Sequence, residues 1–282
     1  MHFTLNDTEI QALLKEDVPY FDLTSSLLNL SPVNAEILFA PKEQVVVCGS
    51  EEVGAIFNLL GVKAESVVKS GEKAAAGETV LKAKGSAELL HMGWKVSQNI
   101  LEHFSAIATR TRSMVECASR GKKNTGIYGT RKHLPGIKHL SLKALCCGGG
   151  LPHRLGLSDS VLFFSNHYDL IGGLEAFCLK LPSIKAGSFE KKIAVEVESV
   201  NDAIMVAEAG ADIVQLDKLS HESVREAAEK IKLINKGAAV AAAGGITDRN
   251  AEDYAAAGAD IIVSSWMYFG KPADYKVTIR KT

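Results

Sequence analysis

From residue 124 onward, short apolar runs alternate with longer stretches in which apolar residues recur every three or four positions. The short runs predict buried strands and the periodic stretches predict helices. Because the strands are apolar on both faces, the pattern favours a parallel sheet that helices cover. The six predicted strands are 124–130, 159–164, 192–198, 211–217, 238–245 and 259–265.

Two segments within this region nearly repeat each other. AEAGADIVQLD, at 207–217, and AAAGADIIVSS, at 255–265, each read as the end of a helix, a glycine that terminates it and a buried strand. A repeated order of strand, loop and helix is typical of barrel-like α/β architecture.

The first part of the chain has a different rhythm, with longer intervals between its apolar runs. It predicts an amphipathic helix followed by a mixture of strands, a hairpin-like sheet edge and further helices. The expected elements are a helix at 4–15, a strand at 35–47, a helix at 50–60, a strand at 63–69, a hairpin within 70–85 and helices covering 86–119.

Composition narrows the class of protein. The 282 residues are 46% hydrophobic and 23% charged, which allows a substantial core. A net charge of -1 provides no general field for nucleic acid or an anionic membrane, so an anionic ligand must be held by local cations. Five cysteines, an odd number, favour a reducing compartment over a disulfide framework. Since no signal peptide and no apolar run of about 18 residues is found, we expect a soluble cytoplasmic protein.

Polar or glycine-rich residues follow the predicted strands where a barrel would gather its functional groups. Arg131 and Lys132 favour an anion site, although they could also be a solvated surface pair. Gly244 and Gly245, ahead of a possible helix cap at Asp248, favour a phosphate site.

Two carboxylates, Glu196 and Asp217, come at the ends of neighbouring predicted strands. Such oxygens could hold Mg²⁺ that carries a phosphorylated substrate. They could instead act as general acid and base, or form ion pairs with Lys132 and Lys218.

The stretch CCGGGLPHR, at 146–154, combines two thiols, three glycines, an imidazole and a guanidinium. A metal site at Cys146, Cys147 and His153 is disfavoured because the spacing of a metal motif is missing, and so is a Walker-type phosphate loop. A plain flexible loop remains open. The favoured interpretation is that the glycines let the backbone pass close to a ligand, to which His153 and Arg154 donate hydrogen bonds.

The ordered series TRK-x-x-PG, CGGG-x-x-HR-x-GL-x-D, NH, EVE, AGAD-x-x-x-LD and GGIT resembles the quinolinate phosphoribosyltransferase family. The resemblance implies an N-terminal α/β sandwich at 1–105, joined by 271–282, and an open α/β barrel at 106–270. It implies transfer of phosphoribosyl from phosphoribosyl pyrophosphate to a quinolinate-like aromatic acid, with loss of pyrophosphate and CO₂. It also implies a homodimer with shared active sites, and neither nucleic acid nor a membrane as partner.

The resemblance further implies roles for individual residues. Lys132, Glu196 and Asp217 would be catalytic, with Mg²⁺ at the two carboxylates. The expected phosphate contacts are Gly244, Gly245 and Ser265. The expected substrate contacts are Lys95, Arg131, His153, Arg154, Phe164, Asn166 and His167.

Several positions depart from the family pattern. Phe164 stands where the family has a substrate-facing lysine, and Lys95 where it has an arginine that crosses between subunits. Ala243 replaces a serine, and the run from Ser265 to Phe269 replaces Gly-Ala-Leu-Thr-His. These changes resemble the ModD branch of the family, pyrophosphorylase-like proteins named for an association with molybdenum transport. We therefore expect phosphoribosyl transfer to be kept and strict quinolinate specificity to be lost.

Two alternatives are kept. The chain could be a catalytically silent homologue that binds a metabolite or anion linked to molybdenum uptake. It could also be a barrel aldolase with Lys218 as a Schiff-base lysine, although the ordered motifs disfavour this. Cys146, Cys147 and Cys178 are expected to be small buried residues rather than catalysts.

Overall fold

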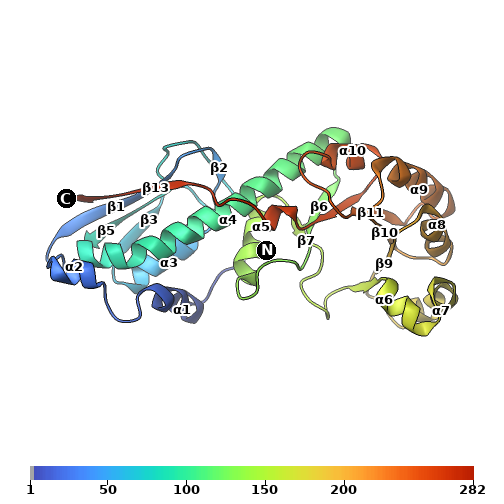
Figure 1. Ribbon diagram of the computed structural model, residues 1–282, viewed down its shortest axis with the longest axis horizontal. Helices are drawn as coiled ribbons and strands as arrows, with labels where there is room; N and C mark the ends of the chain where they lie inside the picture. Colours follow the sequence, from blue (N-terminus) through green and yellow to red (C-terminus); the bar gives the residue numbers. More distant parts are fainter. Residues whose placement is uncertain (1–2) are drawn as a thin grey trace. The chain divides into compact units, whose positions relative to one another are not determined.

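The computed structural model describes residues 3–282, which divide into two compact units (Figure 1). The first unit comprises the chain up to Arg112 together with His133–Gly149 and Tyr268–Thr282. The second comprises Ser113–Lys132 and Gly150–Met267. The predicted domain limits at 105 and 270 stay predictions.

The first unit is built on a four-stranded antiparallel sheet in the order β13-β1-β5-β3. In β1, alternate residues Ile37 and Phe39 are fully buried, as expected for a strand with one covered face. A two-stranded sheet joins β2 to β4. The strands are β1 (Asn34–Pro41), β2 (Val45–Val46), β3 (Lys63–Ser66), β4 (Lys73–Ala74), β5 (Leu81–Ser86) and β13 (Tyr275–Lys281).

The predicted elements of the first unit are present with three differences. The hairpin expected within 70–85 is not formed, because β4 pairs with β2 whereas β5 pairs with β1 and β3. The strand expected at 35–47 is interrupted after Pro41, where the N–H of Lys42 donates to the carbonyl of Asp274. The helices expected at 86–119 form a single helix of 35 residues, α4. The helices are α1 (Asp7–Asp17), α2 (Leu23–Leu27), α3 (Ser50–Leu59), α4 (Ala87–Gly121) and α5 (Lys138–Cys147).

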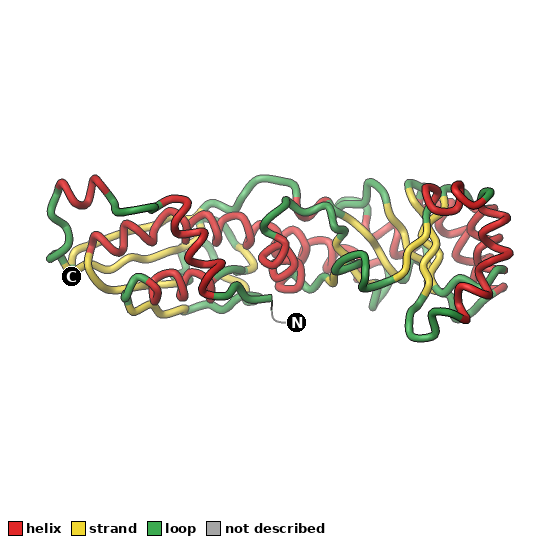
Figure 2. Tube along the Cα trace, turned by 90° about the horizontal axis from the view of Figure 1, so that it is seen from below, coloured by secondary structure: helices red, strands yellow, loops and turns green. Residues whose placement is uncertain are grey.

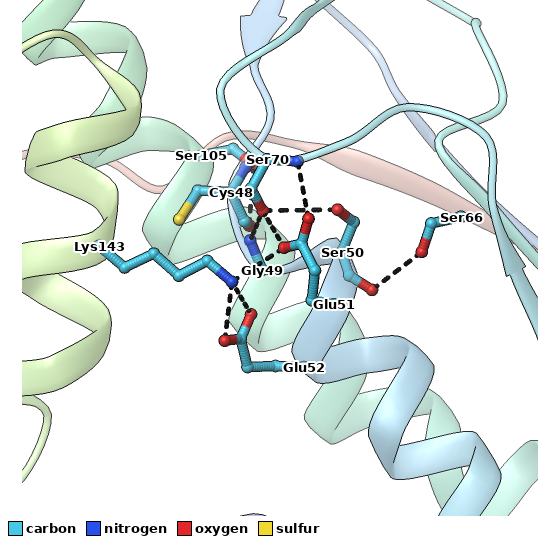
Figure 3. Close-up of polar contacts among 9 residues, drawn as sticks. All are labelled: Cys48, Gly49, Ser50, Glu51, Glu52, Ser66, Ser70, Ser105 and Lys143. Carbon is cyan, nitrogen blue, oxygen red and sulfur yellow. Dashed lines mark hydrogen bonds and ion pairs between the residues drawn. The ribbon is translucent and has the colours of Figure 1, made fainter. Parts of the chain in front are cut away.

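A buried charge network fixes the start of α3 to α5 in this unit (Figure 3). The Lys143 ammonium lies 2.6 Å from a Glu52 carboxylate oxygen and 2.8 Å from one of Glu51. Glu52 is only 2% exposed, so its charge depends on this partner. Burial opposes ionisation of Glu51, but hydrogen bonds from Lys143 and Ser70 outweigh it and lower the pKa of Glu51 to about 2.

The second unit is an open parallel sheet of seven strands in the order β7-β6-β12-β11-β10-β9-β8. Helices lie along the sheet on its outer side (Figures 1 and 2). The strands are β6 (Gly126–Gly129), β7 (Leu151–Pro152), β8 (Val161–Phe163), β9 (Ile193–Val197), β10 (Ile213–Asp217), β11 (Ala239–Ala243) and β12 (Ile261–Ser264). The helices are α6 (Ser165–Tyr168), α7 (Leu174–Ala186), α8 (Val200–Glu208), α9 (His221–Ile234) and α10 (Ala251–Ala256), with short 3₁₀ turns η1 (Asp169–Ile171) and η2 (Trp266–Tyr268).

All six predicted strands of this region are present and pair in parallel, which confirms the predicted α/β fold. The seventh strand, β7, lies within the glycine-rich stretch and consists of two residues, so no apolar run announced it. Within residues 3–282, no helix combines the length and the apolar character needed to cross a bilayer.

The repeated Gly-Ala-Asp segments tie neighbouring strands together at their amino ends. The Asp212 carboxylate accepts from the N–H of Ile193 and from Lys185, at 2.8 Å in each case. The Asp260 carboxylate in the same way accepts from the N–H of Val240 and from two lysines. Burial opposes ionisation of both aspartates, but these donors outweigh it and lower the pKa of each. Asp212 and Asp260 of the repeat are therefore structural residues that link neighbouring strands, and we call them clips.

Gly148, the first of the three consecutive glycines, lies against α4 within the first unit. A Cβ at this position would lie 2.5 Å from the carbonyl oxygen of Ala108 and 2.4 Å from the Cβ of Thr111. Both distances are shorter than any real contact, and neither a helix backbone nor a Cβ can swing away. The glycine is needed for this close approach.

We predict that Gly148→Ala destabilises the protein by about 1–3 kcal/mol, because α5 or α4 must shift to admit the methyl group. Chemical denaturation of the purified variant measures the loss. Gly156→Ala is the matched control, since a Cβ there meets no atom within 4 Å. Equal stability of the two variants would contradict the packing argument.

Candidate active site

The carboxyl ends of the parallel strands surround a cleft of about 940 Å³ within the second unit. This volume is at the upper end of the range for small-molecule sites. The cleft is lined by Thr130, Arg131, Lys132, His153, Arg154, Leu162, Phe164, Glu196, Gln215, Asp217, Lys218, Ala243, Gly244, Gly245, Ile246, Thr247, Val263, Ser264, Ser265 and Trp266.

Parallel pairing of β9 with β10 determines how the two carboxylates meet. Glu196 is the register partner of Gln215, and Asp217 lies two residues further along β10 on the same face. The Gln215 amide nitrogen donates to the Glu196 carboxylate. Burial raises the pKa of Glu196, with a further contribution from the negative charge of Asp217. The strand ends therefore hold two carboxylates close enough to repel each other.

These two carboxylates fit a divalent cation only in part. One Asp217 oxygen lies 2.9 Å from the Lys218 ammonium, and Glu196 already accepts from Gln215. Among residues 3–282, no three His, Cys, Asp or Glu side chains are grouped to hold a metal ion. The chemistry of the donors suits a Mg²⁺ ion that keeps most of its water and is held mainly by substrate phosphates.

The cationic side of the cleft contains Arg131, Arg154 and His153. Burial, together with a smaller contribution from the charge of nearby Arg154, lowers the pKa of His153 to about 4. Burial, and then the charge of Arg131, also lower the pKa of Arg154. The imidazole is thus neutral near pH 7 and offers a hydrogen bond, while the two guanidiniums carry the positive charge. This pair matches a carboxylate or a phosphate.

Apolar side chains also line the cleft. Phe164 follows β8 and its ring meets the His167 ring edge-on at 4.2 Å between centroids. Leu162 and Trp266 line the cleft as well. The cleft therefore combines apolar and aromatic side chains, which suit an aromatic ring, with two guanidiniums.

The glycine turn follows β11. Gly244 and Gly245 both have positive φ, at 89° and 68°, which suits glycine. The Ser264 hydroxyl donates to the carbonyl of Ile246 at 2.7 Å and so ties this turn to the end of β12. The prediction that Asp248 caps the next helix is wrong. Asn250 occupies the cap position of α10, and Asp248 instead accepts from Ser113.

Three predicted substrate contacts lie elsewhere. Asn166 and His167 are exposed on α6, and His167 adjoins the cleft only through Phe164. On α4, the Lys95 ammonium donates to Gln98 and lies over the Trp94 ring. The roles of these three residues stay predictions.

No cysteine among residues 3–282 belongs to a group of three or more His, Cys, Asp or Glu side chains that could hold a metal ion. Cys146, Cys147 and Cys178 are free thiols that are partly exposed, so the expectation that they are buried is wrong for all three. None of them lines the cleft.

Comparison with known proteins decides the family. A family model described as "Quinolinate phosphoribosyl transferase, C-terminal domain" matches residues 107–277, and the corresponding N-terminal model matches residues 22–105. The chain belongs to the quinolinate phosphoribosyltransferase family. Its members identify it as a glycosyltransferase-type enzyme, a pentosyltransferase similar to nicotinate-nucleotide pyrophosphorylases.

Relatives and solved structures of the family cover nearly the whole chain. A Rhodobacter capsulatus protein named "Putative pyrophosphorylase ModD" is 39% identical over 88% of this chain and 95% of its own length. A Pasteurella multocida protein of the same name is 34% identical over 98% of both. The crystal structure of NadC from Streptococcus pyogenes superimposes with a TM-score of 0.88 at 27% identity, over 99% of each chain. The open barrel of this chain is thus the same fold as that of solved members of the family.

Gln215 and Trp266 are among the cleft residues that sequence reasoning missed as members of the site. Gln215 reads as an interior residue of an apolar strand, and only the register with Glu196 reveals its contact. In the sequence, Trp266 is part of an aromatic run, and the pattern does not indicate which way its side chain points. A polar residue two positions before Asp217 in an otherwise apolar strand was the available signal for Gln215.

We predict that Glu196→Gln stabilises this phosphoribosyltransferase at neutral pH. Because the pKa of Glu196 is raised in the folded state, its stability contribution is present at low pH and is lost as pH rises through that pKa. The neutral amide removes this loss. Thermal unfolding should therefore occur at a higher temperature than in the wild type at about pH 7.5, with the difference shrinking towards about pH 4.

Glu198→Gln is the control, since the Glu198 side chain is 72% exposed and its charge remains solvated. It should leave the unfolding temperature unchanged. A Glu196→Gln variant less stable than wild type at about pH 7.5 would refute the argument that this carboxylate is held at an energetic cost.

Proposed function

We propose that this enzyme transfers phosphoribosyl from phosphoribosyl pyrophosphate to an aromatic acid that has a ring nitrogen, and releases pyrophosphate. The observation that carries the proposal is the division of one cleft into two chemistries. Arg131 and Arg154 provide two guanidiniums and Phe164 an aromatic ring to the same cleft, to which Glu196 and Asp217 contribute two carboxylates. The first pair suits an aromatic acid, and the second suits a sugar that becomes positively charged.

The reaction forms one bond and breaks one. The ring nitrogen donates its electron pair to the anomeric carbon, and the bond from that carbon to the pyrophosphate oxygen breaks, with its electrons leaving on pyrophosphate. The ribose ring is oxocarbenium-like at the transition state. The carboxylates of Glu196 and Asp217 stabilise this charge, and their placement before the reaction avoids the cost of reorganising water.

The remaining groups bind the leaving group and the acid. Lys132 contacts the phosphates of the donor, and the 5′-phosphate lies at Gly244, Gly245 and Ser265. Glu196 and Asp217 would hold a Mg²⁺ ion, which would supply positive charge for the departing pyrophosphate. His153, being neutral, donates a hydrogen bond to the acid without adding charge.

We infer that the acid has one carboxylate, which binds to the guanidiniums. The opposite edge of its ring faces Phe164. A second carboxylate at that edge would lose its water against an aromatic ring with no cation to receive it. Quinolinate is thus a poorer fit than a pyridine monocarboxylate, and decarboxylation is not required for turnover. In addition, we propose a cytoplasmic homodimer in which Lys95 serves a neighbouring subunit's site.

The direct test is incubation of the purified protein with phosphoribosyl pyrophosphate, Mg²⁺ and either quinolinate or pyridine monocarboxylates. Release of pyrophosphate is measured with a coupled assay, and release of CO₂ is measured separately. We expect pyrophosphate with at least one monocarboxylate. Donor binding without turnover of any acid would favour a silent binding homologue, and absence of both binding and turnover would refute the function.

Phe164→Lys tests the choice of acid. A cation at this wall should raise kcat/KM for a dicarboxylate relative to a monocarboxylate by about tenfold or more, the amount that one charge-assisted hydrogen bond contributes. Phe189→Lys is the matched control, because Phe189 is 90% exposed and lies outside the cleft. An unchanged preference in the Phe164 variant would show that this wall does not select the acid.

A further inference from the structure

Lys218 has an unusual backbone conformation for a lysine. Its φ is +58°, in the left-handed region, and only two other non-glycine residues among residues 3–282 have positive φ. Both of those are asparagines, Asn29 and Asn124, whose short side chains tolerate this region by bonding locally. A lysine has no such compensation, so the conformation is strained.

Contacts from the neighbouring strand hold Lys218 in this conformation. Its N–H donates to the carbonyl of Ala243 at 2.9 Å. A Cβ on Gly244 would lie 2.7 Å from both the nitrogen and the Cγ of Lys218, so the absence of a side chain at Gly244 makes room for the turn. The end of β10 is thus pressed against the glycine turn that follows β11. Strain maintained in this way at a cleft points to a function.

The consequence of the turn is the position of the ammonium group. It lies 2.9 Å from an Asp217 carboxylate oxygen and 3.7 Å from one of Glu198, and Lys218 lines the cleft. The side chain is nevertheless 73% exposed, so the ammonium is open to a ligand.

The charge balance at this edge explains what the ammonium could do. Glu196, Glu198 and Asp217 together would repel an incoming diphosphate unless a cation lay between them and the phosphates. The Lys218 ammonium lies near two of these carboxylates, while the backbone nitrogen and Cγ of the same residue lie against the glycine turn. It therefore occupies the kind of position that a bridging divalent cation would take.

We propose that Lys218 is a phosphate-binding residue whose ammonium bridges the carboxylate edge and the diphosphate of the substrate, and so lowers the requirement for a divalent metal. The proposal rests on the proposed function in taking a diphosphate as the ligand. The left-handed turn is the device that directs the ammonium over Asp217 instead of letting it extend into solvent.

The experiment measures binding of inorganic pyrophosphate by calorimetry, first in chelator-treated buffer and then at increasing Mg²⁺. The variants are Lys218→Gln, which removes the charge, Lys218→Gly, which removes the charge and relieves the backbone, and Lys218→Arg, which keeps the charge. Lys230→Gln is the control, because Lys230 lies on α9 paired with Glu226 and does not line the cleft. Thermal unfolding verifies that each variant is folded.

Without metal, Lys218→Gln and Lys218→Gly should bind pyrophosphate about tenfold to a hundredfold more weakly than wild type, the effect of one charge-assisted hydrogen bond. The difference should fall to about threefold or less at saturating Mg²⁺. Lys218→Arg and Lys230→Gln should bind as the wild type does.

Three results would overturn the proposal. They are wild-type protein that binds no pyrophosphate without metal, a Lys218→Gln variant that binds as wild type does, and a loss of equal size at every Mg²⁺ concentration. Because no acid is present, failure to turn over any acid leaves this measurement intact. Conversely, turnover by a Lys218→Gln variant with an unchanged Mg²⁺ requirement would leave the proposed function standing and remove the role of Lys218.

Discussion

Parallel register between β9, β10 and β11 is the constraint on which the site depends. It sets Glu196 opposite Gln215, and Asp217 opposite Ala243, so two carboxylates are delivered to one edge with a single amide between them. A shift of one residue in either pairing would turn these side chains to the other face of the sheet. The short apolar strands, which are buried on both faces, therefore also determine where the carboxylates of Glu196 and Asp217 lie.

Much of the second unit could be predicted because its signals are local. Each strand is an apolar run that ends in a polar or glycine residue, and in a parallel sheet such ends share one edge. This reasoning placed Arg131, Glu196 and Asp217 in one region before any geometry was known, whereas Arg154 was assigned from the glycine-rich stretch and the family resemblance. The conformation of Lys218 could not be predicted in the same way, because it depends on Ala243 and Gly244, which lie on another strand. Contacts between strands are invisible in a pattern read along one of them.

The predictions of a helix cap at Asp248 and of several helices over 86–119 were wrong for a related reason. Asp248 has the right residue type for a helix cap, but Ser113, 135 positions away, provides a hydrogen bond that keeps it elsewhere. The continuity of α4 follows from packing along its length, including the close approach of Gly148 to its Ala108 carbonyl. Propensity is a weak guide where tertiary contacts of this kind decide.

The two ends of the parallel sheet use acidic residues in opposite ways. At the amino ends, Asp212 and Asp260 receive backbone N–H groups and lysines, and their pKa values fall because the ionised form is well compensated. At the carboxyl ends, Glu196 is half-buried beside Asp217 and its pKa rises, while Lys218 is held in a strained backbone conformation. A carboxylate that already accepts several hydrogen bonds gains little free energy by binding a further cation. A carboxylate with few donors is stabilised when a cationic sugar or a metal-bound diphosphate binds beside it. The clips at one end thus supply stability that lets the other end keep the strain and repulsion that binding relieves.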